Sequence, residues 1–525
     1  MRGRLLTWAA VAGLVSAGLL PRLAAWGSET RTFASITEDG YLMLTVARNL
    51  AEGHGMSTAA GTMPTNGVQP AVTLLWAAAH VPFGAQPLPA LRVVVLLQLL
   101  IAVVAACGTW ALARRWLSEH PRGDDLSLVA AALWFANPLS LRHTTNGLET
   151  GAYAAGIGAV LLLDRRWPPG CNLGRSCVLG LALGLAFLVR NDAVFLIAPL
   201  LLARVVVDVR ARGAWTRPLL HTLVTGLAAA IVAAPWLGRN LIVFGHLVPT
   251  SGRSQNLEAG VGGNLAALPA TVAELLVPLA PWPDVFRIDS RLAAGLALAL
   301  ALAGGALVAT RRRFGLVVDR QLVVLGATLA GLAAYYGLFF GAAYFLSRYL
   351  FPLTIVGVVA TCAAWARCAE RWPRSATLAA CGAIAVIVVS GGRFTVRGAA
   401  HPHLHVVDWV RAHVGEDQWV AAPQSGTLGY FHDRTVNLDG KVNPDALNAR
   451  RRRELFPYIV NDARIEYLAD WYGLARWWDR PESVPEAGDP GALLRAFDVR
   501  LRDPAHNLFV LQRRREAPAG SVNRP

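Results

Sequence analysis

Two adjacent carboxylates, Glu38 and Asp39, stand just after the point where the chain is expected to leave its first apolar run. A third carboxylate, Glu149, lies in the motif NGLETG, in an expected loop at the same membrane face. Keeping an acid charged next to low-dielectric surroundings is costly, and burial raises its proton affinity. Such carboxylates can take a proton from a substrate hydroxyl, a contribution of about 10²–10⁴-fold in rate. The alternative interpretation of Glu38 and Asp39 is a helix N-terminal cap favoured by the helix dipole, which is compatible with catalysis.

Arginine side chains gather at the same expected face, where the positive-inside rule does not explain them. A single arginine at a membrane interface can be an ordinary snorkelling side chain. Several arginines beside carboxylates are instead typical of a site for an anionic headgroup, because the planar guanidinium binds phosphate oxygens bidentately. The arginines at or near outer span ends are Arg142, Arg190, Arg239, Arg253 and Arg348.

Polar residues of the first outer loop complete the candidate site. The acidic pair is followed by an amphipathic helix from Tyr41 to Ala51, and Gly53-His54-Gly55 is a stop signal for it. The motif PTNGVQP then heads a second outer helix. The candidate substrate-binding residues are therefore Tyr41, His54, Asn66, Gln69, Arg190, Arg239 and Arg348.

The composition indicates a membrane protein. Of the 525 residues, 54% are hydrophobic and 16% are charged, and the mean hydropathy is +0.41, which is too apolar for a soluble chain of this size. The net charge of +15 does not indicate nucleic-acid binding, because the basic clusters fall between apolar runs. If these clusters are cytoplasmic, the positive-inside rule places the N-terminus inside as well.

The apolar runs predict about eleven transmembrane helices, because several of them approach or exceed the ~20 residues that cross a bilayer. Residues 5–25 are expected to be a retained signal anchor, and Pro70 to Phe83 a helix that skims the outer face. Thirteen spans result if one outer helix crosses together with a partner; either odd number leaves the C-terminus outside. The expected spans are 5–25, 91–113, 126–141, 150–163, 176–189, 192–207, 218–236, 291–310, 321–345, 349–367 and 375–391.

Three regions then face the exterior: 27–90, 239–290 and 392–525. The last follows a membrane domain of residues 1–391 and is long enough to bury its own core. We predict an α/β domain, with a helix over 406–414 and a strand–turn–strand unit over 426–444. The predicted fold class is an all-α polytopic membrane protein with a C-terminal extracytoplasmic α/β domain.

Cysteine and lysine usage adds little chemistry. No cysteine lies in the three outer regions, so exported disulfides are not expected. Cys171 and Cys177 lack partners at zinc-binding spacing. Lys441 is the only lysine among 49 basic residues, a bias towards arginine that is typical of genome composition.

Six motifs, in this order, resemble the GT-C glycosyltransferases, which include protein O-mannosyltransferases, the aminoarabinose transferases of lipid A and the catalytic subunit of oligosaccharyltransferase. Many relatives carry two aspartates where this chain has Glu38-Asp39, so the resemblance does not say which carboxylate reacts. The motifs are TEDGYLMLTVARNLAEGHG, TNGVQP, GLETG, PWLGRNLIVFGHLVPTSG, SRYLFP and the C-terminal pair GTLGYF and NLDG.

This resemblance implies an inverting single displacement, in which an acceptor hydroxyl attacks a sugar carried on polyprenyl phosphate or diphosphate. Asp39 is then the expected base, Glu38 its alternative, and Glu149 orients the acceptor or carries a metal. Arg348 and Arg239 are expected to hold the phosphate. No cofactor is implied with certainty; arginine could serve a monophosphate donor, whereas a diphosphate donor favours a divalent ion.

The resemblance also implies a place and partners. The active site and the C-terminal domain are expected on the extracytoplasmic side of the plasma membrane, with the C-terminal domain positioning the acceptor. The acceptor is a lipid, a polysaccharide or a protein, and nucleic acid is not expected. The alternatives are a secondary transporter and a non-catalytic protein that binds lipid-linked sugars. A transporter would place charged sites near the bilayer midplane, often in inverted repeats.

Overall fold

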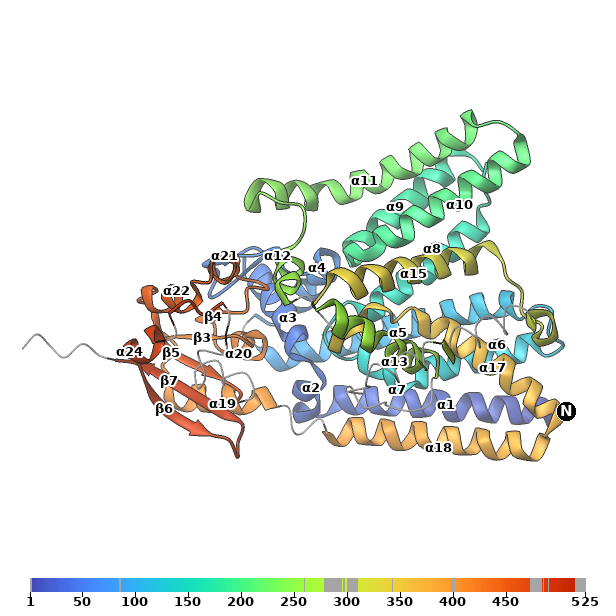
Figure 1. Cartoon of the computed structure of the whole chain (residues 1–525). Coiled ribbons are helices and arrows are strands. Elements are labelled where there is room, and N and C mark those ends of the chain that lie inside the picture. The colour runs from blue at the N-terminus through green and yellow to red at the C-terminus, as the bar shows by residue number, and fades with distance from the viewer. Residues whose placement is uncertain are drawn as a thin grey trace, which may run out of the picture.

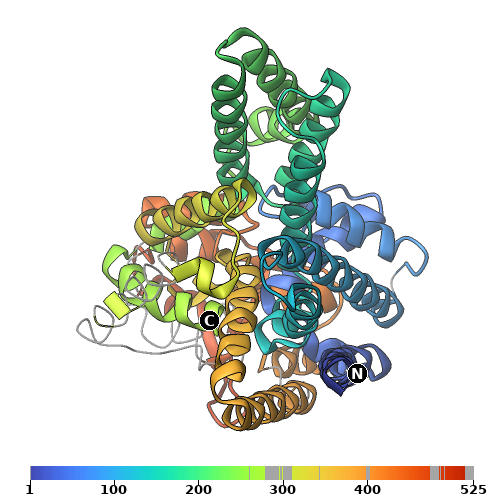
Figure 2. The same cartoon turned by 90° about the vertical axis from the view of Figure 1, so that its right-hand side faces the viewer.

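The computed structural model describes residues 2–84, 86–258, 260–277, 310–341, 343–397, 402–472 and 491–514, with 295, 298, 299, 484 and 486–489. A helical body carries an α/β domain at one end, and the N-terminus lies at the opposite end (Figure 1). Seen along the body, α9, α10 and α11 project to one side of the other helices (Figure 2). The body therefore has two ends, of which one is covered by the C-terminal domain.

Among the described residues, six helices are long and apolar enough to cross a membrane. The predicted polytopic helical architecture is confirmed, while the total of eleven spans stays a prediction. Most of the expected span 291–310 lies outside the described residues. The six helices are α1 (Arg2–Gly27), α5 (Pro87–Trp116), α11 (Thr216–Phe244), α15 (Arg320–Phe339), α17 (Leu353–Arg371) and α18 (Pro373–Arg397).

The expected span 126–141 is interrupted in the structure. It consists of α6 (Gly123–Ala136) and α7 (Pro138–His143), with Asn137 between them. The residue before a proline disfavours helical backbone, and the Asn137 side chain accepts a hydrogen bond from the Leu139 N–H at 2.8 Å to start α7. The chain then continues through α8 (Thr150–Arg166), α9 (Leu173–Val189), the turn η1 (Asn191–Ala193) and α10 (Val194–Arg212).

The first outer loop folds into short elements packed against the second. These elements are α2 (Glu29–Ser35), α3 (Glu38–Ala51), β1 (Ser57–Thr58), β2 (Met63–Pro64) and α4 (Pro70–His80). Thr37 caps α3 by accepting a hydrogen bond from the Gly40 N–H. A Cβ at Gly40 would lie 2.0 Å from the Asn146 carbonyl oxygen, so only glycine lets the acidic motif lie this close to NGLETG.

A further outer segment contains a helix that we did not predict. After α12 (Thr250–Gln255) and η2 (Asn256–Glu258), α13 (Val261–Leu276) packs against α15 and α17. Its Asn264 side chain donates to the Phe340 carbonyl, just beyond α15. The chain returns through η3 (Arg311–Phe314), α15, η4 (Ala343–Phe345) and α16 (Leu346–Tyr349) to α17.

The C-terminal domain is α/β, as predicted. Its sheet has the order β4-β3-β5-β7-β6; β3 pairs parallel with β4 and β5, while β7 pairs antiparallel with β5 and β6. Buried apolar residues form one cluster on each side of this sheet. The strands are β3 (Trp419–Ala422), β4 (Thr435–Asn437), β5 (Ile465–Asp470), β6 (Phe497–Asp503) and β7 (Leu508–Arg513); the helices are α19 (Pro402–His413), α20 (Gly426–Phe431), α21 (Pro444–Arg452), α22 (Leu455–Asn461) and α24 (Ala492–Ala496).

One local prediction in this domain was wrong. The strand–turn–strand unit over 426–444 is a helix, α20, followed by β4 and a loop. Alternating residues suggested a strand, but α20 packs on α3, where a Cβ at Gly426 would lie 2.1 Å from the Glu38 carbonyl oxygen. This long-range contact between the acidic motif and the C-terminal domain is not visible in the local pattern.

Candidate active site

The two adjacent carboxylates point to different places. The Glu38 carboxylate accepts hydrogen bonds from the N–H groups of Gly426 and Thr427 and from the Thr427 hydroxyl. Asp39 instead lines a cavity between the helical body and the C-terminal domain. Neighbouring helix residues project about 100° apart. Glu38 can therefore bind the C-terminal domain while Asp39 faces the cavity.

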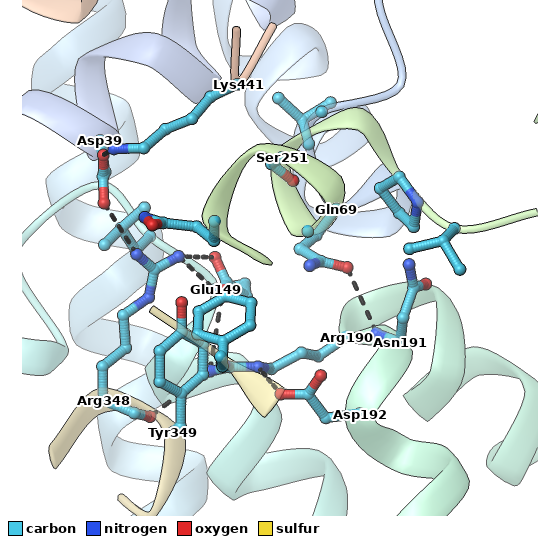
Figure 3. A pocket seen from close by; sticks show the side chains of 18 of the residues that line it. Asp39, Gln69, Glu149, Arg190, Asn191, Asp192, Ser251, Arg348, Tyr349 and Lys441 are labelled. Carbon is cyan, nitrogen blue, oxygen red and sulfur yellow. Dashed lines mark hydrogen bonds and ion pairs between the residues drawn. The ribbon is translucent and has the colours of Figure 1, made fainter. Parts of the chain in front are cut away.

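Arg348 joins the two carboxylates that face the cavity. Its Nη1 donates to Asp39 Oδ2 at 3.0 Å, and its Nη2 donates to Glu149 Oε1 and Oε2 at 3.1 and 3.3 Å. Lys441 reaches Asp39 from the other side, with Nζ 3.3 Å from Oδ1 (Figure 3). Each oxygen of Asp39 therefore has its own cation, one from the helical body and one from the C-terminal domain.

Arg190 lies deeper and supports Glu149. Its Nη1 is 3.5 Å from Glu149 Oε1, and its Nε donates to Asp192 Oδ2 at 2.6 Å. The guanidinium lies over the Tyr349 ring at 4.6 Å from the centroid, and Tyr336 stacks on that ring at 3.9 Å. These contacts fix the orientation of Arg190, because a planar cation stacked on an aromatic face loses its freedom to turn.

The cations govern the charge of both acids. Burial alone would raise the pKa of Asp39, but Lys441 and Arg348 together hold it below its ordinary value. Burial also acts to raise the pKa of Glu149, and Arg348 and Arg190 lower it. The cations therefore reverse the higher proton affinity that we expected from burial, and both acids are carboxylates at neutral pH.

The cavity has a volume of about 410 Å³ and two unlike parts. Its charged end contains Asp39, Glu149, Arg190, Arg348 and Lys441. The rest of its wall is mainly apolar, which suits a ligand with an anionic head and a hydrocarbon chain. The apolar and aromatic lining residues include Phe187, Val194, Phe195, Leu237, Leu247, Val248, Tyr335 and Phe340.

Gln69 is the one predicted substrate-binding residue of the first outer loop that lines the cavity. Its Oε1 accepts a hydrogen bond from the Asn191 N–H at 3.3 Å. Asn66 instead holds Thr250, whose N–H and hydroxyl donate to Asn66 Oδ1 at 2.9 and 2.6 Å. The Tyr41 hydroxyl donates to the Phe33 carbonyl at 2.7 Å.

Two other predicted residues also contact protein. Arg239 donates to the backbone carbonyls of Thr65 and Met56 at 3.1 and 3.4 Å, and His54 is about half exposed beside Glu52. Neither is among the residues that line the cavity. Substrate contact by Arg239, His54, Asn66 and Tyr41 stays a prediction.

Sequence reasoning missed three members of the site. Asp192 was not singled out, Tyr349 was named only as part of SRYLFP, and Lys441 only as a peculiarity of composition. The available signals were an acid two residues after a buried arginine and a lone lysine in an arginine-rich chain. Neither signal indicates by itself which cavity the side chain enters.

The residues present do not form a ready metal site. Within the described parts of the chain, no group of three His, Cys, Asp or Glu side chains could hold a metal ion. The Asp39 and Glu149 oxygens contact cationic side chains.

Comparison with known proteins adds a family model and structural neighbours. Residues 394–499 match a domain of unknown function, DUF8728. No protein of curated function matches the sequence.

The crystal structure of ArnT from Cupriavidus metallidurans bound to undecaprenyl phosphate is similar, with a TM-score of 0.53 and 14% identity over 95% of this chain and 98% of that one. An oligosaccharyltransferase from Archaeoglobus fulgidus, tethered with an acceptor peptide containing the NVT sequon, has a TM-score of 0.52 and 12% identity over 97% and 74% of the two chains. Both neighbours are GT-C glycosyltransferases. The expected GT-C fold is thus confirmed.

Proposed function

We propose that this protein is a membrane glycosyltransferase that moves a sugar from a polyprenyl-phosphate carrier to a hydroxyl of an extracytoplasmic acceptor. The observation that carries the proposal is Asp39, held between Arg348 and Lys441 at the charged end of a mainly apolar cavity. A base, a pair of phosphate-binding cations and an apolar wall are the three parts that such a transfer needs.

The reaction would be a single displacement with inversion. The acceptor oxygen bonds to the anomeric carbon while the bond from that carbon to the phosphate oxygen breaks. The acceptor proton passes to Asp39, and the electron pair leaves with the lipid phosphate, whose charge the guanidinium of Arg348 stabilises bidentately. Glu149 and Arg190 keep Arg348 in place through the contacts described above.

Donor binding would also make Asp39 a better base. The cations around Asp39 lower its proton affinity. A phosphate that binds Arg348 competes with the carboxylate for that cation. The Asp39 pKa then rises towards the value that its buried surroundings favour, so proton acceptance is promoted only when a leaving group is present.

The apolar wall supports an isoprenoid as the carrier. Phe187, Phe195, Leu237 and Tyr335 come from four helices, α9, α10, α11 and α15, which together lie beside the charged cluster. The structural neighbour that was solved with undecaprenyl phosphate shares this fold.

The decisive test is Asp39→Asn in the full-length protein reconstituted in liposomes with a panel of polyprenyl-phosphate sugars. The carrier whose sugar is used can be found first, as the lipid-linked sugar that accumulates in a deletion strain. We expect the variant to bind the carrier but to release at least 100-fold less polyprenyl phosphate than the unchanged protein, because the amide cannot accept a proton.

Glu52→Gln, at the far end of α3, is the matched control and should retain activity. Release of polyprenyl phosphate at the normal rate by Asp39→Asn would refute the assignment of Asp39. A transporter or a non-catalytic binding protein would release none in any variant, including the unchanged chain.

A further inference from the structure

Lys441 is the only lysine among 49 basic residues, and it lies in the cavity. A bias towards arginine acts on every basic position of the chain. Lysine offers a compact, strongly hydrated point charge on a flexible stem with rotatable donors, whereas arginine offers a rigid planar fork.

The loop that carries Lys441 is held in place from both parts of the molecule. The Lys441 backbone N–H donates to Asp439 Oδ1 at 2.8 Å. The Asp439 carbonyl accepts hydrogen bonds from the Ser254 hydroxyl and the Arg450 guanidinium. On the side of the first outer loop, a Cβ at Gly67 would lie 2.0 Å from the Lys441 carbonyl oxygen. The backbone is thus fixed while the long side chain extends into the cavity (Figure 3).

The ammonium of Lys441 is shared between two acids. Nζ is 3.3 Å from Asp39 Oδ1 and 3.5 Å from Asp439 Oδ2. All three side chains keep some exposure, 15% for Lys441, 26% for Asp39 and 13% for Asp439. An incoming phosphate can therefore reach the ammonium, and Asp439 can keep it oriented after it leaves Asp39.

We propose that Lys441 is a donor-phosphate ligand supplied by the C-terminal domain, and that it moves from Asp39 to the lipid phosphate when the donor binds. This inference rests on the proposed function. When Lys441 moves to the phosphate, Oδ1 of Asp39 becomes free to accept the acceptor proton. The site is then complete only when the C-terminal domain is docked, and the contacts of Glu38 with Gly426 and Thr427 hold it there.

The lone lysine makes a direct test feasible. In the full-length protein, an amine-specific acetylating reagent can modify only Lys441 and the N-terminal amine. We expect polyprenyl phosphate to reduce acetylation of Lys441 at least fivefold by mass spectrometry, with the N-terminal amine unaffected. Polyprenol tests the lipid without its phosphate and should not protect, whereas protection by inorganic phosphate would identify a free-phosphate site. Equal acetylation with and without polyprenyl phosphate would overturn the proposal.

Binding measurements keep the proposal testable if ion pairing makes Lys441 unreactive. Lys441→Met should weaken polyprenyl-phosphate binding about 10- to 100-fold, the expected loss of a charged hydrogen bond. Lys441→Arg should recover the binding only in part, and Arg500→Ala, at an exposed position of β6, should change nothing. Normal binding by Lys441→Met would refute the role of the lysine alone. Absence of binding by the unchanged protein would instead refute the proposed function.

Discussion

At the residue scale, two arginines of the site are shared among three carboxylates. Arg348 contacts Asp39 and Glu149 at once, and Arg190 contacts Glu149 and Asp192. Removing one cation therefore changes more than one carboxylate. Such shared pairs are costly to break, because a buried charge without a partner loses several kcal/mol of compensation, about 3–5 kcal/mol in comparable cases.

Arg348→Ala should weaken binding of the lipid donor by about 1.5–3 kcal/mol, the cost of losing one charged hydrogen-bond partner. Arg348→Lys should recover only part of the loss, because an ammonium cannot bridge Asp39 and Glu149 with a planar fork. Binding of polyprenyl phosphate to detergent-solubilised protein measures this effect. Unchanged affinity for polyprenyl phosphate in the alanine variant would show that Arg348 is an ordinary interfacial arginine.

The pH dependence of transfer should move when the same cation is removed. In the unchanged protein, Lys441 and Arg348 hold the Asp39 pKa below its ordinary value, so Asp39 stays ionised until the pH falls below that value. In Arg348→Gln, burial acts with one opposing cation fewer, and the acid limb of kcat/KM should shift to higher pH. If the acid limb of kcat/KM does not shift in this variant, the ionisation of Asp39 does not determine that limb.

At the element scale, close backbone contacts bring the parts of the site together. Three glycines carry these contacts, and in each case a Cβ would lie within 2.1 Å of a carbonyl oxygen on another segment. Gly40 meets Asn146, Gly67 meets Lys441 and Gly426 meets Glu38. The first outer loop, NGLETG and the C-terminal domain are thus placed within hydrogen-bonding distance of one another.

Gly67→Ala should push the loop of Lys441 away from the first outer loop. An overlap this large cannot be absorbed by a flexible side chain, and overpacking commonly costs about 1–3 kcal/mol. We expect a lower thermal midpoint and a loss of transfer that exceeds the loss of stability. Gly262→Ala in α13 is the control, since among the described residues no atom beyond its chain neighbours and its own helix backbone lies within 4 Å of the added Cβ. Full transfer by Gly67→Ala would show that the position of Lys441 is not critical.

At the scale of the whole molecule, the charged cavity lies between the helical body and the C-terminal domain. The N-terminus lies at the opposite end of the helical body (Figure 1). Elsewhere in the body, Asp164 contacts Arg204 and Arg320, and Arg115 contacts Asp319. A cavity at the end opposite the N-terminus agrees with the positive-inside interpretation, whose orientation stays a prediction.

Topology reporters should place the two ends on opposite sides of the membrane. A fusion after Arg115 should report the cytoplasm, and a fusion after Arg397, where α18 ends, should report the exterior. The reason is that short loops rich in arginine are retained inside. Reporting from the same side by both fusions would invalidate the orientation assumed for the active site.

The amino-acid sequence by itself determined the class of the molecule and most of its long elements. Apolar length predicted the membrane helices, because a bilayer admits only segments that satisfy their own backbone hydrogen bonds. The change of composition after residue 391 predicted the α/β domain. Asp39, Glu149, Arg190 and Arg348 could be singled out from charge placement alone, since a charge at a membrane boundary needs a reason.

The tertiary structure decided which of these residues meet and what each contacts. It separated Glu38 from Asp39, because adjacent helix positions point in different directions. It also brought Lys441 next to Asp39 across 402 positions of the chain and made a helix of Gly426–Phe431. The local spacing of polar and apolar residues predicts the face of an element on which a side chain lies. Its partner is determined only by long-range packing and by close approach of backbone segments.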